Sequence, residues 1–520
     1  MFNLNFDEYK DKVLGCWYGK NIGGTLGTEN ERDTSINNVS FLPDKNKDNP
    51  APNDDLDLQL VWLAALERYG VQGITKERLA EMWMGHIIGP WGEYVNCKLN
   101  IANGLYPPLS GSCNNDVWRN SNGAWIRSEI WACICPGAPD EAIEYAYMDS
   151  CVDHSGEGIY SEMFTAAAES AAFVLNDLRQ IIEVGLSKIP EDSLTAELIR
   201  LAIDGFDRKL SWQETRNLIV EKNTLGWFQA PANVAFAVVG LLYGEGDFGK
   251  TVCRAVNCGD DTDCTGGFAG ALLGIMLGKK GLPDHWCNFI GKNIITCAIN
   301  KFEFYECPIP ETVDELTERV VKQGLISSLI NAGTVPALSS GKTEIPAAVF
   351  EQISGKEWAA RIHQRSPYEL EFHAPFAEIS VDYENGPFCT PGEAKKITVR
   401  TVRYTGTYDD ISWRWILPES WSADVATGHL IAINSGLGVL ENTLIPGEFP
   451  EAVTFVPLEV TLASRRTKCV FQVPFVLKNT FNYVVGQLPD KFARDWKRWN
   501  KNPHLPMTGF ALPEGIQNEA

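Results

Sequence analysis

The 520-residue sequence contains no apolar run close to the roughly 20 residues that a helix needs to cross a bilayer. Its first residues, Met1–Glu8, have neither the basic region nor the hydrophobic region of a secretory signal peptide. We therefore expect no membrane association and no export of the chain.

Basic residues are also scarce. The chain has 45 Lys and Arg against 67 Asp and Glu, which gives a formal net charge of -22. Nucleic-acid phosphates are bound by clustered Lys and Arg, so this charge argues against nucleic acid as a partner. It does not exclude a phosphorylated small molecule that binds together with divalent metal ions.

The sequence has 14 cysteines but lacks the paired CxxC spacing of structural zinc sites. Most cysteines lie in apolar segments such as Trp131–Cys135, as expected of buried and reduced thiols. We therefore predict a cytoplasmic protein. Cys264 is the exception, because it lies inside an acidic motif.

The length exceeds one typical hydrophobic core and predicts a multidomain chain. Residues 1–330 have apolar positions at helical spacing and predict an all-α domain. A linker and connecting segment follows at 331–369. From 370 to 480, apolar and polar residues alternate, as in Ile411–Leu417, and predict a smaller all-β, Ig-like sandwich. The C-terminal tail, 481–520, is expected to pack back on the body.

Residues 85–130 predict a long loop within the helical domain. Aromatic residues such as Trp91 and Trp118 lie there among Gly, Asn and Pro. A loop of this length in a compact domain is usually functional. Its aromatic side chains could line a cleft for a base or a sugar, or they could cover the core.

The segment Asn257–Gly267 holds three carboxylates within four residues. Like charges this close are costly to bury, so a folded chain keeps them on an exposed turn or around a cation. A buried helix is expected to follow, with the positive end of its dipole among the carboxylates. Taken alone, the segment fits a metal site and an acidic capping turn equally well.

Glycine recurs at every fourth position after this segment, at Gly266, Gly270 and Gly274. This spacing suits a helix whose backbone lies close against a neighbour. A second glycine-rich stretch, Gly19–Gly24, weakly resembles a phosphate-binding loop. No predicted strand precedes it, so a tight helix crossing is the better explanation.

A second acidic helix start lies in Pro52–Leu66, where Leu56, Leu60 and Leu63 fall at helical spacing. For a single helix, an acidic N-cap would explain the pattern. Two such starts, far apart in the sequence, could also converge on hard cations such as Mg²⁺ or Mn²⁺, which prefer oxygen ligands.

A third motif lies in Met148–Tyr160. His154 stands there beside Asp153 and close to Glu157, among glycines and ahead of an Ala-rich helix. A lone histidine is commonly a structural residue. The combination of His, two carboxylates and two glycines fits a functional site equally well.

These motifs resemble, in the same order, those of the ADP-ribosylglycohydrolase family, which includes dinitrogenase reductase-activating glycohydrolase. Asn53–Asp55 lies where the family has Ser/Thr-Asp-Asp at a helix start, and His154 where it has a mid-chain His near a glycine turn. Asp261–Asp263 matches the Asp-Thr-Asp that precedes a small-residue helix. Gly23–Glu31 aligns with the family's Gly-Asp-Ala-Leu-Gly-x-x-x-Glu.

The resemblance implies an all-α domain with a binuclear site of two divalent cations, Mg²⁺ or Mn²⁺. It also implies hydrolysis of the bond from ribose C1″ of ADP-ribose to a protein side chain or a small acceptor. The implied metal-site residues are Asn53, Asp54, Asp55, Asp261, Asp263 and Thr265. The expected catalytic residues are Glu31 and Asp55. The expected substrate-binding residues are His154, Gly156, Glu157 and Gly158.

The sequence departs from the family pattern at several positions. Gly24 replaces an Asp, and Cys264 takes the place of the final Thr, where a hard oxygen would be expected. Either Thr265 supplies the hydroxyl instead, or the second metal site is altered. Asp57 and Asp260 are extra carboxylates that could take part.

Three functions follow from this resemblance and its departures. The first is a hydrolase of ribosyl N- or O-glycosides, whose metal ions hold ribose hydroxyls and activate water, with ADP-ribose linked to a small molecule or to a protein as substrate. The second is a hydrolase of a nucleoside or of another furanosyl glycoside. The third is a catalytically silent protein that binds ADP-ribose.

Overall fold

The computed structural model describes residues 2–89, 91–300, 308–403, 410–430, 437–462 and 466–480. The chain divides into two compact units. The helical unit comprises residues 1–94 and 117–364, and the β unit comprises residues 95–116 and the chain from 365 onward. The predicted C-terminal tail, 481–520, lies outside the described residues.

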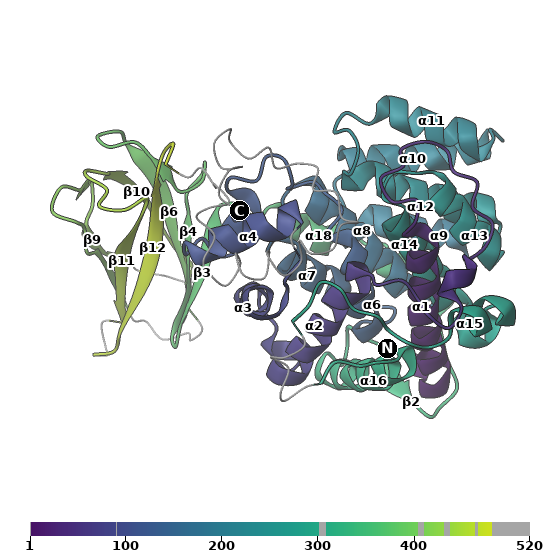
Figure 1. The fold of residues 1–520 in the computed structure, drawn as a ribbon. Coiled ribbons are helices and arrows are strands. Elements are labelled where there is room, and N and C mark those ends of the chain that lie inside the picture. Colours follow the sequence, from purple (N-terminus) through teal and green to yellow (C-terminus); the bar gives the residue numbers. More distant parts are fainter. Residues whose placement is uncertain are drawn as a thin grey trace. The chain divides into compact units, whose positions relative to one another are not determined.

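The helical unit consists mainly of helices joined by turns (Figure 1). A short parallel pair, β1 (Asn3–Asn5) and β2 (Ala337–Ser339), completes it. The longer helices are α1 (Phe6–Gly27), α2 (Asp54–Tyr69), α3 (Lys76–His86), α7 (Pro139–Ser150), α8 (Glu157–Ala172), α9 (Leu178–Ser187), α10 (Leu194–Asp207), α11 (Trp212–Lys222), α12 (Ala230–Gly244), α13 (Phe248–Asn257), α14 (Thr262–Gly281) and α16 (Val313–Ile330). The shorter ones are α6 (Glu129–Ile134), α15 (Asp284–Ile290), α17 (Val349–Ile353) and α18 (Glu357–His363).

Helices α1 and α14 pack against each other through their glycines. A Cβ atom added at Gly19 would overlap the backbone of Gly270, and one added at Gly23 would overlap that of Gly266. The two helices therefore lie side by side and antiparallel (Figure 1). Glycine at every fourth position leaves one face of each helix without side chains, which permits this contact. The predicted tight helix crossing is confirmed, and it brings the end of α1 to the start of α14.

We expect Gly23→Ala to lower the free energy of unfolding by about 1–3 kcal/mol, the usual cost of overpacking. The reason is that its methyl group would collide with the carbonyl group of Gly266. Gly85→Ala in α3 is the matched control, because a Cβ there meets nothing within 4 Å. It should stabilise the helix by about 0.5–1 kcal/mol. Urea denaturation followed by circular dichroism measures both changes, and equal shifts would contradict the close contact.

The β unit contains two five-stranded sheets, with strand orders β3-β4-β6-β10-β8 and β5-β12-β11-β7-β9. Neighbouring strands are antiparallel, except that β5 and β12 are parallel. The strands are β3 (Glu369–Ala374), β4 (Ala377–Asp382), β5 (Phe388–Cys389), β6 (Lys395–Arg403), β7 (Ile411–Trp415), β8 (Ser422–Ala423), β9 (Thr427–Leu430), β10 (Leu437–Ile445), β11 (Val453–Leu462) and β12 (Lys468–Leu477).

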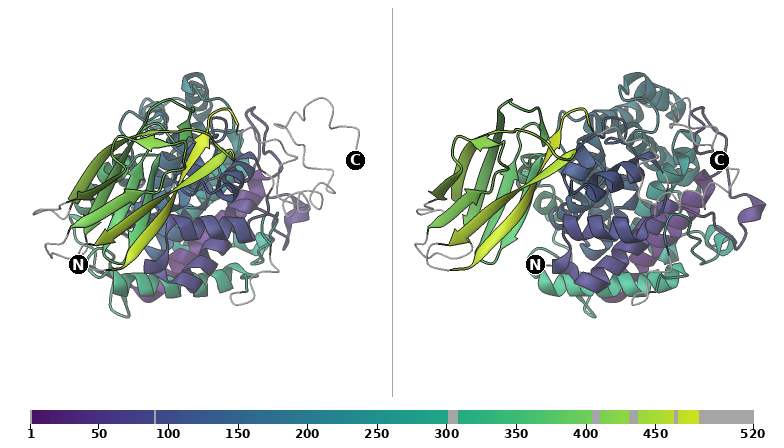
Figure 2. Two further views of the ribbon diagram at one scale, coloured as in Figure 1. Left: turned by 90° about the vertical axis from the view of Figure 1, so that its left-hand side faces the viewer. Right: turned by 60° about the vertical axis from the view of Figure 1, so that its left-hand side comes forward.

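The two sheets lie face to face (Figure 2). Alternate side chains of both sheets form one hydrophobic core. In the first sheet, Val381 of β4 pairs with Val399 of β6. In the second, Trp413 of β7 pairs with Val460 of β11. All four side chains are buried in this core. The predicted all-α domain followed by a β-sandwich is therefore confirmed, whereas the Ig-like topology stays a prediction.

The prediction of a long loop at residues 85–130 is wrong over much of that segment. The structure forms α4 (Gly92–Ala102) and the short helix α5 (Leu109–Ser112) there. Leu105, Leu109 and Cys113 belong to the core of the β unit. The Gly, Asn and Pro residues of this segment resemble loop punctuation, and its packing partners lie far away in the sequence.

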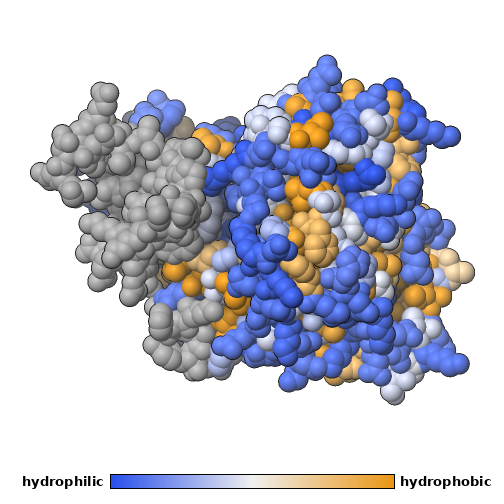
Figure 3. Space-filling view, turned by 45° about the vertical axis from the view of Figure 1, so that its right-hand side comes forward, coloured by the Kyte–Doolittle hydropathy of each residue, from blue (hydrophilic) through white to orange (hydrophobic). Residues whose placement is uncertain are grey.

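None of the helices in the described part of the chain is both long and apolar enough to cross a membrane. On the face shown in Figure 3, hydrophilic side chains predominate and hydrophobic ones form scattered patches. Scattered apolar side chains of this kind are normal on protein surfaces and need no special role.

Candidate functional site

The N-terminal ends of α2 and α14 meet in space. The side-chain oxygen of Asn53, the N-cap of α2, accepts a hydrogen bond from the backbone N of Asp55 at 2.7 Å. Its Nδ2 donates to Asp263 Oδ2 of α14 at 3.4 Å, although the two residues lie 210 positions apart. Cys264 Sγ donates to Asp55 Oδ1 at 3.7 Å. The residues gathered here, called the helix-start cluster below, are Asn53, Asp54, Asp55, Asp261, Asp263 and Cys264.

Three side chains of the helix-start cluster form a compact donor set. Asp55, Asp263 and Cys264 each offer one ligand atom, and these atoms lie within 4.8 Å of one another. All three residues are buried. Asp55 Oδ2 and Asp263 Oδ1 have no hydrogen-bond partner. Buried carboxylate oxygens are costly unless a proton or a cation compensates them, so this donor set fits a divalent cation.

The electrostatics of the cluster also favour a cation. Burial raises the pKa of Asp55 well above its usual value; Lys20 acts against this shift, and Asp263 adds to it. Burial, Glu31 and Asp261 together raise the pKa of Asp263. The carboxylates therefore repel one another where water cannot screen them, and added positive charge would relieve the repulsion.

The outer carboxylates of the cluster are held by hydrogen bonds. Tyr94 OH donates to Asp54 Oδ2 at 2.9 Å, and Asn122 Nδ2 donates to Asp261 Oδ2 at 2.6 Å. Asn122 is itself fixed, because its Oδ1 accepts a hydrogen bond from Trp125 Nε1 at 3.0 Å. Neither Tyr94 nor Asn122 was predicted to support the carboxylates, since both fall in the segment interpreted as a loop. Such supporting contacts orient ligand carboxylates.

Glu31 lies beside the cluster because of the helix pairing. Thr262 Oγ1 at the start of α14 donates to Gly27 O at the end of α1 at 2.7 Å, so the chain after α1 passes the carboxylates. The Glu31 side chain is 34% exposed, and its Oε1 lies 3.4 Å from Arg32 Nε. Burial raises the pKa of Glu31, Arg32 lowers it, and Asp54 raises it. Glu31 is thus a solvent-reachable carboxylate close to the helix-start cluster.

His154 belongs to a buried network with Arg127. Its Nδ1 lies 2.8 Å from Asp153 Oδ1, and its Nε2 lies 3.0 Å from Ser121 Oγ. Arg127 Nη2 donates to the same Asp153 oxygen at 2.7 Å. Burial raises the pKa of Asp153, but Arg127 and His154 lower it more, to about 2. Asp153 is therefore ionised at neutral pH, and it fixes the orientation of the imidazole ring.

Glu93, which was not predicted as a site residue, connects this network with the cluster. A Cβ atom added at Gly123 would lie 3.1 Å from both Glu93 Oε1 and His154 Cε1, so the two side chains flank the same glycine. Burial raises the pKa of Glu93; His154 lowers it, and Asp54 is among the groups that raise it. His154 and the helix-start cluster are thus electrostatically linked through Glu93.

A family model described as ADP-ribosylglycohydrolase matches residues 5–324, which is more than half of the chain. The chain belongs to the ADP-ribosylglycohydrolase family. The matched range contains both acidic helix starts, Glu31 and His154, and it ends before the strands of the β-sandwich. A search of curated proteins finds no match.

In this member of the ADP-ribosylglycohydrolase family, Lys20 lies behind the acidic cluster, although it was not predicted as a site residue. Lys20 Nζ lies 3.6 Å from Asp55 Oδ2 and 2.8 Å from Glu129 Oε1, and all three side chains are buried. Burial lowers the pKa of Lys20, but Glu129 and Asp55 raise it more, so the net pKa lies above its usual value. The sequence signal that could have identified Lys20 is a charged residue within a glycine-rich apolar helix. Lys20 places one permanent positive charge behind Asp55.

The glycine turn around His154 has a structural explanation in this family member. Gly156 has a φ of 60° and forms the N-cap of α8. The Glu157 carboxylate accepts hydrogen bonds from the backbone N of Leu194 at 2.9 Å and of Thr195 at 3.0 Å. Glu157 therefore caps the start of α10. A Cβ added at Gly158 would lie 2.8 Å from His154 Cδ2, so the glycine leaves room for the imidazole ring.

Three further predicted participants lie outside the helix-start cluster. Thr265 Oγ1 donates to Ala255 O at 3.3 Å, so the structure does not bring this hydroxyl among the carboxylates. Asp57 Oδ2 accepts two backbone hydrogen bonds at 2.6 Å from the segment at 297–298. Asp260 accepts a hydrogen bond from Asn233 Nδ2 at 2.8 Å. Cys264, and not Thr265, stands beside Asp55 and Asp263.

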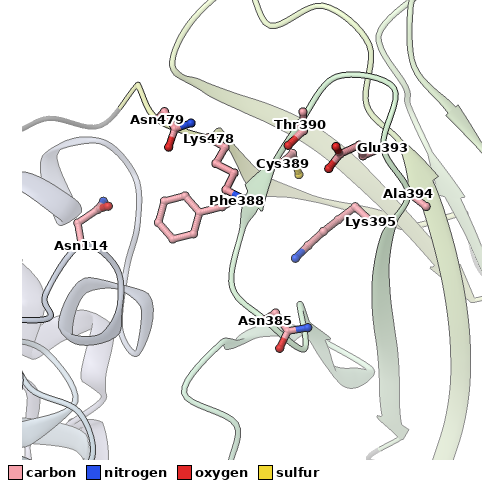
Figure 4. Close-up of a pocket in the computed structure, with 10 residues that line it drawn as sticks. All are labelled: Asn114, Asn385, Phe388, Cys389, Thr390, Glu393, Ala394, Lys395, Lys478 and Asn479. Carbon is pink, nitrogen blue, oxygen red and sulfur yellow. The ribbon is translucent and has the colours of Figure 1, made fainter.

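The β unit has a separate pocket of about 560 Å³ (Figure 4). Its lining includes the aromatic ring of Phe388, several amide side chains, and the amino groups of Lys395 and Lys478. Among the described lining residues, Glu393 is the only carboxylate. The described lining of this pocket offers no cluster of cation ligands.

Proposed function

We propose that this protein hydrolyses a ribosyl N- or O-glycosidic bond in ADP-ribosylated molecules, with two divalent cations held by the helix-start cluster. The observation that carries the proposal is the meeting of Asp55 and Asp263, each with a buried oxygen that lacks a hydrogen-bond partner. Members of the ADP-ribosylglycohydrolase family generally depend on divalent metal ions, and this donor set fits one.

The residues of the cluster have different roles in holding the cations. Asp55 and Asp263 supply the inner oxygens, while Asp54 and Asp261 are oriented by Tyr94 and Asn122. Divalent ions bound there supply positive charge that orients ribose hydroxyls and makes water more acidic. The N-terminal ends of α2 and α14 both lie at the cluster, and their helix dipoles favour the anionic diphosphate of the substrate.

Glu31 is the proposed general base. Cleavage of a ribosyl bond passes through an oxocarbenium-like state, in which the bond from C1″ to the acceptor atom breaks as water attacks. The Glu31 carboxylate accepts the proton that water loses, and the acceptor leaves with the bonding electrons. His154 is fully buried and its ring nitrogens face Asp153 and Ser121, so we infer that it supports the site rather than transferring protons.

We expect Glu31→Gln to lower kcat by about 10²–10⁴-fold, the usual contribution of a general base. Cation binding should stay within the range of the wild-type protein, because Glu31 lies beside the cluster and not in its inner donor set. Glu29→Gln is the matched control on the same loop, since Glu29 is exposed and pairs with Lys45 at the surface. A Glu31→Gln enzyme with normal kcat would remove Glu31 from the mechanism.

A hydrolysis assay separates the possible substrates. Incubation with peptides ADP-ribosylated on Arg or Ser should release free ADP-ribose, and a chelator should abolish the release. Turnover of nucleosides or simple furanosides, with none of the ADP-ribosylated peptides cleaved, would overturn the proposed substrate class. ADP-ribose binding without any turnover would overturn the proposal of an enzyme.

A further inference from the structure

Cys264 occupies a cation-ligand position in the helix-start cluster. Its Sγ lies with one oxygen each of Asp55 and Asp263 in a group whose members are within 4.8 Å of one another. Only 4% of the residue is exposed, and its thiol donates to Asp55 Oδ1. The ADP-ribosylglycohydrolase pattern has Thr at this position, so the thiol is a feature of this chain.

A second observation at the same place points to a ligand independently of the cysteine. Asp263 is 7% exposed, yet its Oδ1 has no hydrogen-bond partner. Asp55 is 1% exposed, and its Oδ2 makes no hydrogen bond but lies 3.6 Å from Lys20 Nζ. Such oxygens are costly in the folded state unless a cation or a proton satisfies them. The thiol therefore belongs to a site that the carboxylates already define.

The donor chemistry distinguishes between metals. Two carboxylate oxygens alone suit hard cations such as Mg²⁺, which avoid sulfur. A thiolate together with carboxylates suits Zn²⁺ and Co²⁺, which accept mixed oxygen and sulfur donors. Lys20 Nζ, 3.6 Å from Asp55 Oδ2, offsets part of the negative charge that a third anionic ligand adds.

We propose that Cys264 binds as a thiolate at one cation position of the helix-start cluster, so that this position prefers a thiophilic divalent ion, such as Zn²⁺ or Co²⁺, over Mg²⁺. Binding breaks the S–H bond, forms a sulfur–metal bond and releases the proton to solvent. This proposal rests on the proposed function only in that both assign divalent cations to the helix-start cluster.

The test uses Co²⁺ as a probe on the full-length protein after treatment with a chelator. Cobalt bound to a thiolate has a near-ultraviolet charge-transfer absorption that cobalt bound to oxygen lacks. We expect this band in the wild-type protein and its loss in both Cys264→Ser and Cys264→Thr. The first variant differs from wild type by one atom, so it tests the ligand with the least effect on folding.

Cys297→Ser is the matched control. Cys297 is a second thiol near the site, since burial and then nearby carboxylates, Asp54 and Asp263 among them, raise its pKa, but it is not in the compact donor set. The band should persist in this variant. Equilibrium dialysis measures the affinities for Co²⁺ and Mg²⁺ in parallel. Changes outside a ligand set already cost about 10- to 100-fold in metal affinity, so Cys264→Ser should lower the preference for Co²⁺ over Mg²⁺ by at least tenfold.

Two results would overturn the thiolate ligand and leave the hydrolase proposal intact. One is Co²⁺ bound by the wild-type protein without the band, and the other is a band that disappears in Cys297→Ser but not in Cys264→Ser. If neither Co²⁺ nor Mg²⁺ binds, both proposals fail. Where Co²⁺ binds without the band, the hydrolysis assay with Mg²⁺ and Mn²⁺ on the same preparation shows whether the hydrolase proposal stands.

Discussion

Asp55→Asn and Asp263→Asn should each abolish tight binding of divalent cations and reduce hydrolysis to near background. Each substitution removes the charge from a buried carboxylate in the inner donor set. Changes to residues that only support metal ligands cost about 10- to 100-fold, so the loss of a ligand should exceed a hundredfold in turnover. Isothermal titration with Mn²⁺ and the ADP-ribose release assay measure the two effects.

Asp177→Asn is the matched control for these variants. Asp177 caps α9 by accepting hydrogen bonds from the backbone N of Arg179 and of Gln180, and asparagine caps helices as well as aspartate does. Cation binding, turnover and stability should stay at wild-type levels. Normal cation affinity in Asp263→Asn would mean that the meeting of α2 and α14 has no role in metal binding.

Lys20→Met should lower the free energy of unfolding by about 3–5 kcal/mol, the usual cost of leaving a buried charge without its partner. The substitution removes the ammonium group that lies 2.8 Å from Glu129 Oε1 and 3.6 Å from Asp55 Oδ2, while it keeps the apolar stem. Urea denaturation at constant ionic strength measures the change.

The pH dependence of this loss tests its electrostatic origin. Without Lys20, burial raises the pKa of Glu129 further above that of the unfolded chain, so the folded variant binds more protons than the unfolded one. Its stability should therefore rise, relative to wild type, as the pH is lowered toward about 5. The double variant Lys20→Met, Glu129→Gln should recover part of the loss at neutral pH. A Lys20→Met protein as stable as wild type would contradict a structural role for the pair.

Much of the fold follows from periodic patterns in the sequence. Glycine at every fourth position in α14 predicts a backbone contact, because no other residue leaves a helix face empty, and Gly23 against Gly266 shows that contact. Alternation predicts the strands because one face of each sheet is buried, as with Val381 and Trp413. Leu105 was predicted to lie in a loop, but its side chain is part of the β-unit core. That packing depends on strands that begin more than 250 positions later.

The site was predictable only where its residues form local patterns. Asp55 and Asp263 stand in clusters at helix starts, and this local signal was sufficient to select them. Lys20 and Glu93 stand alone in the sequence, and only the folded chain brings them to the carboxylates. For Glu157 the local pattern was misleading. The pattern suggests a substrate contact, but the Glu157 carboxylate caps a helix that is distant in the sequence.

The position of bound Mn²⁺ tests the central claim most directly. A crystal of the full-length protein grown with Mn²⁺, measured at the manganese absorption edge, locates the ion through its anomalous scattering. We predict anomalous peaks between the starts of α2 and α14, within bonding distance of Asp55 and Asp263. Peaks elsewhere on the protein, with those two carboxylates free of metal, would contradict the proposed metal-dependent enzyme.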